Sequence, residues 1–210
     1  MRRETGLGLT GTTVILGVIG LLAAVLLPTV FEYIEDQRAS RAQVYSSAIA
    51  NAIVQLYRDT RRLPYMTDPS DTARTLAWQA GDYYFLTGEN GSCPAEEVPW
   101  GIDLNGQNTC TGAGKDSDTL ENHLVNNRPG GKGSYPTAGQ FRWRGPYLDP
   151  GVVDPWGNKY VVNIRQADPL LGPRAVFVLS AGRNGTIETA FNQAADSFTV
   201  GGDDIVARVR

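Results

Sequence analysis

The stretch GLGLTGTTVILGVIGLLAAVLLPTVF, residues 6–31, decides the fold of this chain. It carries no charged side chain, and it exceeds the roughly 20 mainly apolar residues that a helix needs to cross a bilayer. Arg2 and Arg3 precede it, and basic residues of this kind stay on the cytoplasmic side of a membrane. The sequence therefore predicts a membrane-spanning helix, with everything after residue 31 on the far side.

A cleaved secretory signal and a plain membrane anchor are two interpretations of this segment. Signal peptidase requires a short apolar core followed by a small-x-small site. Here Leu26, Leu27 and Pro28 follow Ala23 and Ala24 instead, so removal of the whole segment by signal peptidase is not expected.

A third interpretation is that the segment is the first half of one long helix that continues into a globular head. The residues beyond the apolar stretch suggest it, because helical periodicity continues there. Apolar residues recur at spacings of three and four at Tyr45, Ala48, Ile49, Ala52, Ile53 and Leu56, as on a helix that packs against a domain. One helix from about Leu7 to Thr60 would be roughly 80 Å long. Its transmembrane half would lie in lipid and its amphipathic half against a globular head, with Pro28 bending or loosening it between them.

The last third of the chain predicts strands. Lys159–Ile164, Ala175–Leu179 and Ile205–Val209 are short runs rich in valine and isoleucine and bounded by turn residues, as an antiparallel sheet requires. The predicted class is α+β: a long N-terminal helix packed on a small C-terminal antiparallel sheet, with a loop-rich insertion between them. About 150 residues remain after the helix, which suits one domain.

Two features stand out in the insertion. Cys93 and Cys110 are the only cysteines, and an even pair on the oxidising side of a membrane predicts one disulfide; two free buried thiols are the alternative. Further on, residues 120–127 predict a short helix, and Trp143 and Tyr147 are expected to anchor a loop rich in glycine and proline to the core.

Candidate catalytic groups are sparse, and we expect no enzyme and no catalytic residue. His123 is the only histidine; without a cysteine or serine nucleophile nearby, we expect a surface or capping role. Asp116, Asp118 and Glu121 form an acidic cluster that is typical of a solvated helix start. The formal net charge of -3 offers no basic field, so no nucleic-acid partner is expected.

The N-terminal pattern resembles the type IV pilin superfamily, whose members are cut by prepilin peptidase after a glycine that follows a short basic leader. Gly6 matches that glycine, which makes Leu7 the first mature residue and residues 1–6 the leader. The family's apolar core then falls on VIGLLAAVLLP. The resemblance implies phenylalanine first and glutamate fifth in the mature chain, whereas this sequence has Leu7 and Gly11.

The C-terminal motifs narrow the resemblance to the major pseudopilin of type II secretion systems. WRGPYL, DPWGNKYVV, VFVLSAGRNG and GGDDIVARV follow one another in the order seen in that family. DPWG is expected to be architectural: Pro155 and Gly157 form a turn, and Trp156 closes the loop onto the core.

The same resemblance implies a calcium site in the C-terminal loop. The matching positions are Asn184, Asp203 and Asp204, and calcium binds six to eight oxygen ligands. Residues 186–200, TIETAFNQAADSFTV, lengthen this loop, and its Glu188 or Asp196 could supply a further oxygen. A solvated acidic hairpin without an ion is the alternative.

The resemblance implies a structural subunit of a type II secretion pseudopilus or of a type IV pilus-like filament. Residues 1–6 would be the leader, 7–30 the transmembrane and assembly helix, and 31–210 the head. The expected partners are further copies in a helical filament, other pilin-like subunits, prepilin peptidase and an inner-membrane assembly platform. Before assembly the protein would lie in the inner membrane with a periplasmic head, and afterwards in a periplasmic or extracellular filament. The alternative, which Gly11 favours, is a single-span, membrane-anchored periplasmic binding or scaffold protein that does not polymerise.

Overall fold

The computed structural model describes residues 8–64, 85–97, 100, 117–129, 133–167 and 172–209. The chain divides into two compact units after Arg38, and the long helix α1 (Leu9–Thr60) contributes to both. The remaining elements are β1 (Phe85–Thr87), β2 (Ala95–Glu96), β3 (Ser117–Thr119), α2 (Leu120–Leu124), β4 (Val161–Val162), the 3-10 helix η3 (Ile164–Ala167), β5 (Phe177–Ser180), β6 (Thr186–Ile187) and β7 (Ile205–Arg208). The α+β class with a long N-terminal helix agrees with the prediction.

The main sheet has five strands in the order β3-β1-β4-β5-β7. As predicted, β4, β5 and β7 pair antiparallel. The expectation of an antiparallel sheet was nevertheless wrong for the whole, because β1 pairs parallel with β3. The long connection between these two strands permits such a crossover. A second, two-stranded parallel sheet joins β2 to β6.

The strands are shorter than the sequence predicted. In β4 (Val161–Val162), the side chain of the next residue, Asn163, explains the early end of the strand. Its side-chain Oδ1 accepts a hydrogen bond from the Phe177 backbone N–H at 2.8 Å, and its Nδ2 donates to the Ala175 carbonyl at 2.9 Å. A buried side chain thus takes over positions that a longer strand would fill with backbone groups.

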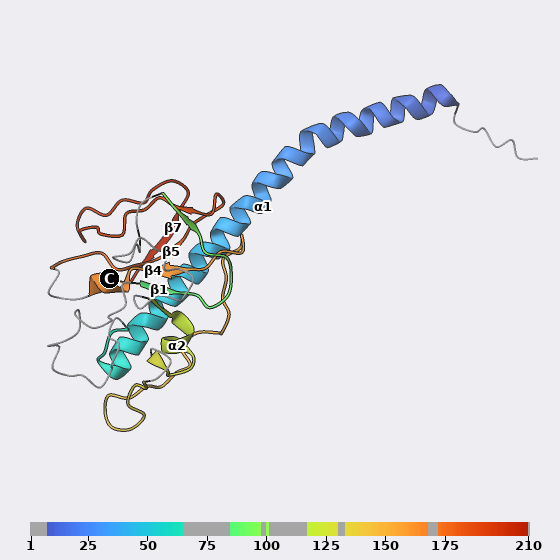
Figure 1. The fold of residues 1–210 in the computed structure, drawn as a ribbon. Coiled ribbons are helices and arrows are strands. Elements are labelled where there is room, and N and C mark those ends of the chain that lie inside the picture. The colour runs from blue at the N-terminus through green and yellow to red at the C-terminus, as the bar shows by residue number, and fades with distance from the viewer. Residues whose placement is uncertain are drawn as a thin grey trace, which may run out of the picture. The chain divides into compact units, whose positions relative to one another are not determined.

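One face of the sheet packs against the second half of α1 (Figure 1). Strand alternation places Val162, Val178 and Ala207 on this face. From the helix, Ile49, Ile53 and Leu56 are fully buried, as the periodicity predicted. Toward its start the predicted stripe was wrong, because Tyr45 and Ala48 are exposed. The small residues Ala42 and Ser46 take the buried positions instead, since short side chains let the helix lie close to the sheet.

The opposite face of the sheet is covered by the segment that follows β6. Phe191 and Phe198 pack there with Trp100 against Phe177 and its neighbours. Trp100 meets the rings of Phe177 and Phe191 edge-on at 5.5 and 5.4 Å, and its indole N–H donates to the Thr189 carbonyl at 2.6 Å. Residues 186–200, which were expected only to lengthen a loop, therefore form a second layer of the core together with Trp100.

The end of α1 is closed by Arg61, whose positive φ of 58° stops the helix. The loop expected to be anchored by Trp143 and Tyr147 lies beside it, and both rings pack against the core. The Tyr147 hydroxyl donates to Asp59 Oδ2 at 3.0 Å, and the Tyr147 backbone N–H donates to the Leu124 carbonyl at 2.7 Å. The loop is thus tied to both helices of the head.

Replacing Leu56 by alanine should lower the free energy of unfolding by about 2 to 5 kcal/mol, because the side chain is fully buried and its removal leaves a cavity. Val44→Ala, on the same helix but 66 % exposed, is the matched control and should change stability by less than about 0.5 kcal/mol. Denaturant unfolding of the two variants checks this. Equal, small effects would contradict the packing of α1 on the sheet.

Candidate functional site

The first unit of the chain consists of the apolar part of α1. By length and composition this helix could span a membrane, and none of its most apolar window is buried. Its large side chains are strongly exposed, among them Leu16, Leu21 and Val25. Pro28 lies inside the helix without ending it. Exposure of such a surface to water is unfavourable, so this segment calls for an apolar environment.

Gly6 and Leu7, the residues of the expected processing site, lie outside the part of the chain that the structure describes. Gly11 lies in the first turn of α1, where its backbone N–H donates to the Gly8 carbonyl at 2.8 Å. The first turn contains no acidic side chain. The first turn of α1 therefore lacks the carboxylate that the resemblance to pilins implies at position 11.

In the C-terminal loop, two of the three expected calcium ligands lie together with Glu188. Asp203 Oδ2 accepts hydrogen bonds from the backbone N–H groups of Arg183 and Asn184 at 2.8 and 3.0 Å. Asn184 Nδ2 donates to Glu188 Oε2 at 3.2 Å, and the same Oε2 accepts from the Asp203 N–H at 3.2 Å. Asp196, the other residue considered, is exposed. Asn184, Glu188 and Asp203, which we call the loop cluster, thus link the two ends of the loop.

Asp204, the third expected ligand, lies beside this cluster and is buried. Its Oδ2 accepts hydrogen bonds from the backbone N–H groups of Glu188 and Thr189 at 2.9 and 2.6 Å. Burial raises the pKa of its carboxyl group above the ordinary value, although the hydrogen bonds from Glu188 and Thr189 oppose the shift. Its Oδ1 is buried without a hydrogen-bond partner of acceptable geometry.

Glycines make the close approach of these two chain segments possible. Gly182 and Gly202 have positive φ values of 60° and 47°. A Cβ atom at Gly201 would overlap the Glu188 carbonyl oxygen, and one at Gly182 would overlap that of Asp203. The backbone that carries the loop cluster therefore depends on Gly182, Gly201 and Gly202.

The oxygens of the loop cluster and Asp204 are of the type that calcium prefers. Most of those named already accept hydrogen bonds from backbone or side-chain N–H groups, which hold the carboxylates without an ion. Within the described ranges, no group of three or more histidine, cysteine, aspartate and glutamate side chains is placed to hold a metal. A cation would have to combine the buried Oδ1 of Asp204 with amide and carbonyl oxygens of the loop.

The DPWG turn is held by Asp154 more than by Trp156, which is only partly buried. Asp154 is 2 % exposed. Its Oδ1 accepts from the N–H groups of Trp156 and Asn158, and its Oδ2 accepts from the Ser180 hydroxyl at 2.8 Å. Gly157 has the expected positive φ, at 91°. The turn is thus fastened to β5 by a buried carboxylate, which the Asp-x-x-Gly pattern could have indicated.

His123 is fully buried, so the expected surface role was wrong. Its Nδ1 lies 2.6 Å from the Tyr135 hydroxyl and its Nε2 lies 2.9 Å from Asp118 Oδ2. The short helix predicted over residues 120–127 ends at Leu124, and Asn127 turns away with a φ of 50° to pair with the Tyr135 backbone.

Asp118 and Glu121, two members of the predicted acidic cluster, are not solvated. Asp118 and Glu121 are buried, and burial raises the pKa of Glu121, whose Oε2 accepts from the Glu89 N–H. Asp116 lies outside the described residues. These groups fasten α2 to its neighbours, and none of them presents a nucleophile at the surface.

Cys93 is disulfide-bonded. Cys110, the only other cysteine of the sequence, is not among the residues whose structure is described.

No protein-family model matches the chain, and neither a curated protein nor a solved structure matches it significantly. Its function must therefore be inferred from its own residues.

Replacing Asp204 by asparagine should change how stability depends on pH. Burial raises the folded-state pKa of Asp204 above its ordinary value of 3.8. The contribution of this carboxyl group to the free energy of unfolding is therefore complete below pH 3.8 and is lost as the pH rises through the folded pKa. In buffer that contains a chelator, the free energy of unfolding of the wild type minus that of Asp204→Asn should increase as the pH falls. Asp196→Asn, which removes an exposed carboxylate, is the control. Thermal melts at several pH values that give parallel curves would contradict this assignment.

Proposed function

We propose that this protein is a pilin-like structural subunit that assembles into a filament through the apolar part of α1. The observation that carries the proposal is the contrast along this one helix. Residues 11–31 of this helix are uncharged and none of them is buried, whereas from Ala42 onward its small and branched residues bury against a sheet. A helix of this kind can leave a bilayer only if other apolar helices replace the lipid around it.

The resemblance of the sequence to major pseudopilins supports the assignment of the filament to type II secretion. On this proposal, prepilin peptidase removes residues 1–6, and an inner-membrane platform transfers the subunit from the membrane into the filament. The head would then decorate the filament in the periplasm or outside the cell. A surface pilus formed by the same assembly is the related possibility.

Gly11 bears on the position of the subunit in such a filament. A glutamate at this place would neutralise the new N-terminal amine of a neighbouring subunit, and an unpaired charge within an apolar bundle is costly. Gly11 provides no carboxylate. The chain therefore suits a tip or initiating position, where no such pair with a preceding subunit is required.

A membrane-anchored scaffold that never polymerises is the second candidate, and Gly11 is the observation that favours it. Such a protein would keep the apolar helix in the lipid permanently. Its head would fold in the same way, because the residues that pack on the sheet begin only after the first unit.

Intact-mass analysis of protein in sheared filaments should find a chain that begins at Leu7, with an N-methylated amine. The filament fraction should contain this chain because its apolar helix is held in the bundle. Gly6→Arg should block cleavage after residue 6 and remove the protein from the filaments.

The matched control is Thr5→Arg, which adds the same charge within the leader but leaves Gly6 and the apolar helix unchanged; it should leave cleavage and incorporation into filaments intact. A protein found only in membranes, in full-length form and absent from every filament preparation, would support the scaffold function and overturn the filament proposal.

Calcium binding in the C-terminal loop is a separate proposal, supported by the buried Asp204 Oδ1 beside the loop cluster. A calcium concentration of about one hundred times the dissociation constant should stabilise the fold by about 2.7 kcal/mol. Chelator should remove this gain, and magnesium should replace calcium poorly. Asp204→Ala should abolish the response, and Asp196→Ala should leave it intact. An unchanged melt in millimolar calcium would favour the ion-free hairpin.

A further inference from the structure

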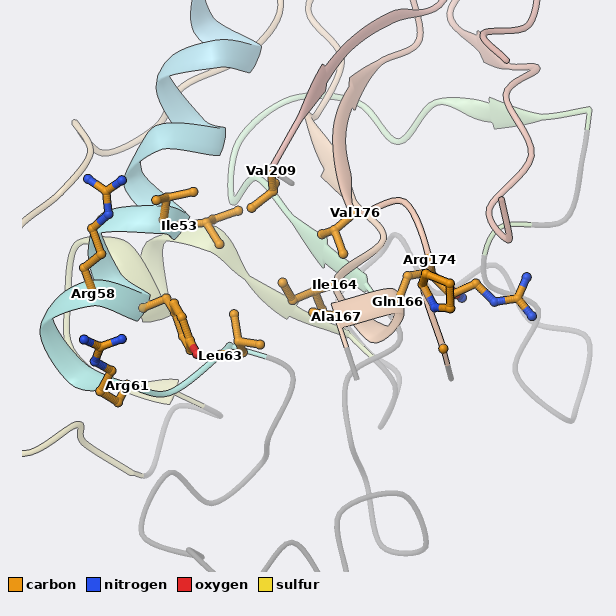
Figure 2. A pocket seen from close by; sticks show the side chains of 14 residues that line it. Ile53, Arg58, Arg61, Leu63, Ile164, Gln166, Ala167, Arg174, Val176 and Val209 are labelled. Carbon is orange, nitrogen blue, oxygen red and sulfur yellow. The ribbon is translucent and has the colours of Figure 1, made fainter. Parts of the chain in front are cut away.

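A cavity of about 460 Å³ lies between the end of α1 and the sheet, within the second unit of the chain. Its volume is in the range of small-molecule sites. The walls are mostly apolar, and they come from α1, η3, the start of the β5 region and the end of β7: Ile53, Val54, Leu63, Ile164, Ala167, Pro173, Val176 and Val209. Figure 2 shows the labelled apolar side chains gathered in the centre of the view.

Among the described residues that line this cavity, the charged groups are all cationic. They are Arg58 and Arg61 at the end of α1 and Arg174 on the other side, and Figure 2 shows these arginines at the edges of the apolar centre. The described lining residues include no aspartate or glutamate. An apolar chamber with a cationic edge is complementary to a molecule with an apolar body and an anionic end.

Two of these arginines are available to such an anion in different ways. Arg61 lies over the rings of Tyr57 and Phe141, with its guanidinium carbon 6.0 and 5.5 Å from their centroids. This holds it near the cavity while leaving its N–H donors able to bind. Arg58 is exposed and forms none of the ion pairs found among the described residues, so its side chain can turn toward a ligand at low cost.

We propose that this cavity binds a single-chain alkyl carboxylate, with the alkyl chain along Val54, Leu63 and Ala167 and the carboxylate at Arg58 and Arg61. The buried Ile53 forms part of the wall behind the chain. The volume is too small for a folded partner, and the arginines among the described lining residues favour an anionic over a cationic amphiphile. This site is independent of the apolar part of α1 and of filament assembly.

The test uses the full chain in phosphatidylcholine nanodiscs, because its apolar helix needs a bilayer. The probe is dodecanoate carrying a diazirine, and mass spectrometry locates the photo-crosslinks. Labels should appear in the peptides that contain residues 53–63 and 164–176, and excess unlabelled dodecanoate should suppress them. Diazirine derivatives of dodecanol and of dodecyltrimethylammonium are the neutral and cationic comparisons.

Arg58→Gln should reduce the apparent affinity about fivefold, since an exposed ion pair is individually weak. Arg58→Lys, which keeps the charge, should retain most of it. Arg41→Gln removes an exposed arginine from the same helix outside the cavity and should have no effect. Ala167→Phe should fill the cavity and abolish labelling, and a thermal melt of this variant verifies that it is folded. In the wild type, the methyl NMR signal of Ile53 provides an independent measure of binding.

Labels confined to residues 9–34 would show that the probe only follows the lipid, and would overturn the proposal. Equal labelling of the cavity peptides by the cationic probe would overturn the role of the arginines and with it the ligand class. Failure of dodecanoate to shift the Ile53 methyl signal would overturn binding in the cavity itself.

Discussion

The burial of one face of α1 against the sheet is the interaction on which the rest of the head depends. Strands of two to four residues are too short to be stable as an isolated sheet. A helix with Ile49, Ile53 and Leu56 on one side is equally unsuited to water. Their contact removes both apolar surfaces from solvent at once. It also positions η3, the end of α1 and the cavity between them.

The sheet is covered by α1 on one face and by the irregular segment after β6 on the other. In that segment, side-chain hydrogen bonds replace much of the regular secondary structure. Asn163 donates to the Ala175 and Phe191 carbonyls, and Gln193 binds the backbone at Ala190 and Thr199. These amides satisfy buried backbone groups that no strand or helix pairs. These hydrogen bonds let a long irregular segment carry Phe191 and Phe198 onto the sheet.

Carboxylates in this head serve mainly to hold backbone N–H groups. Asp154 closes the DPWG turn, Asp203 closes the turn at Asn184, and Asp204 joins the strand end to Thr189. The same chemistry that could bind a cation is thus already used to fix loops, which explains how the C-terminal loop is ordered by its own hydrogen bonds. The proposed functions of the two units are separable: the apolar helix associates with lipid or with other helices, and the head presents its loops and cavity.

The sequence by itself determined the long helix, the α+β class, the three C-terminal strands and the position of the DPWG turn. These follow from local properties: an uncharged run, a spacing of three and four, β-branched alternation, and residues that favour turns. The resemblance to pseudopilins also implied that Asn184, Asp203 and Asp204 belong to one loop between the last strands.

Only the tertiary structure decided which side chains face inward. Ser46 instead of Tyr45 is buried because the helix must approach the sheet closely, and His123 is buried because the chain turns after α2 and brings Tyr135 back onto it beside Asp118. The parallel pairing of β1 with β3, the cover formed by Phe191 and Phe198, and the arginines around the cavity likewise depend on contacts between residues far apart in sequence. Local pattern carries no signal for such contacts, since their free energy exists only once the segments have come together.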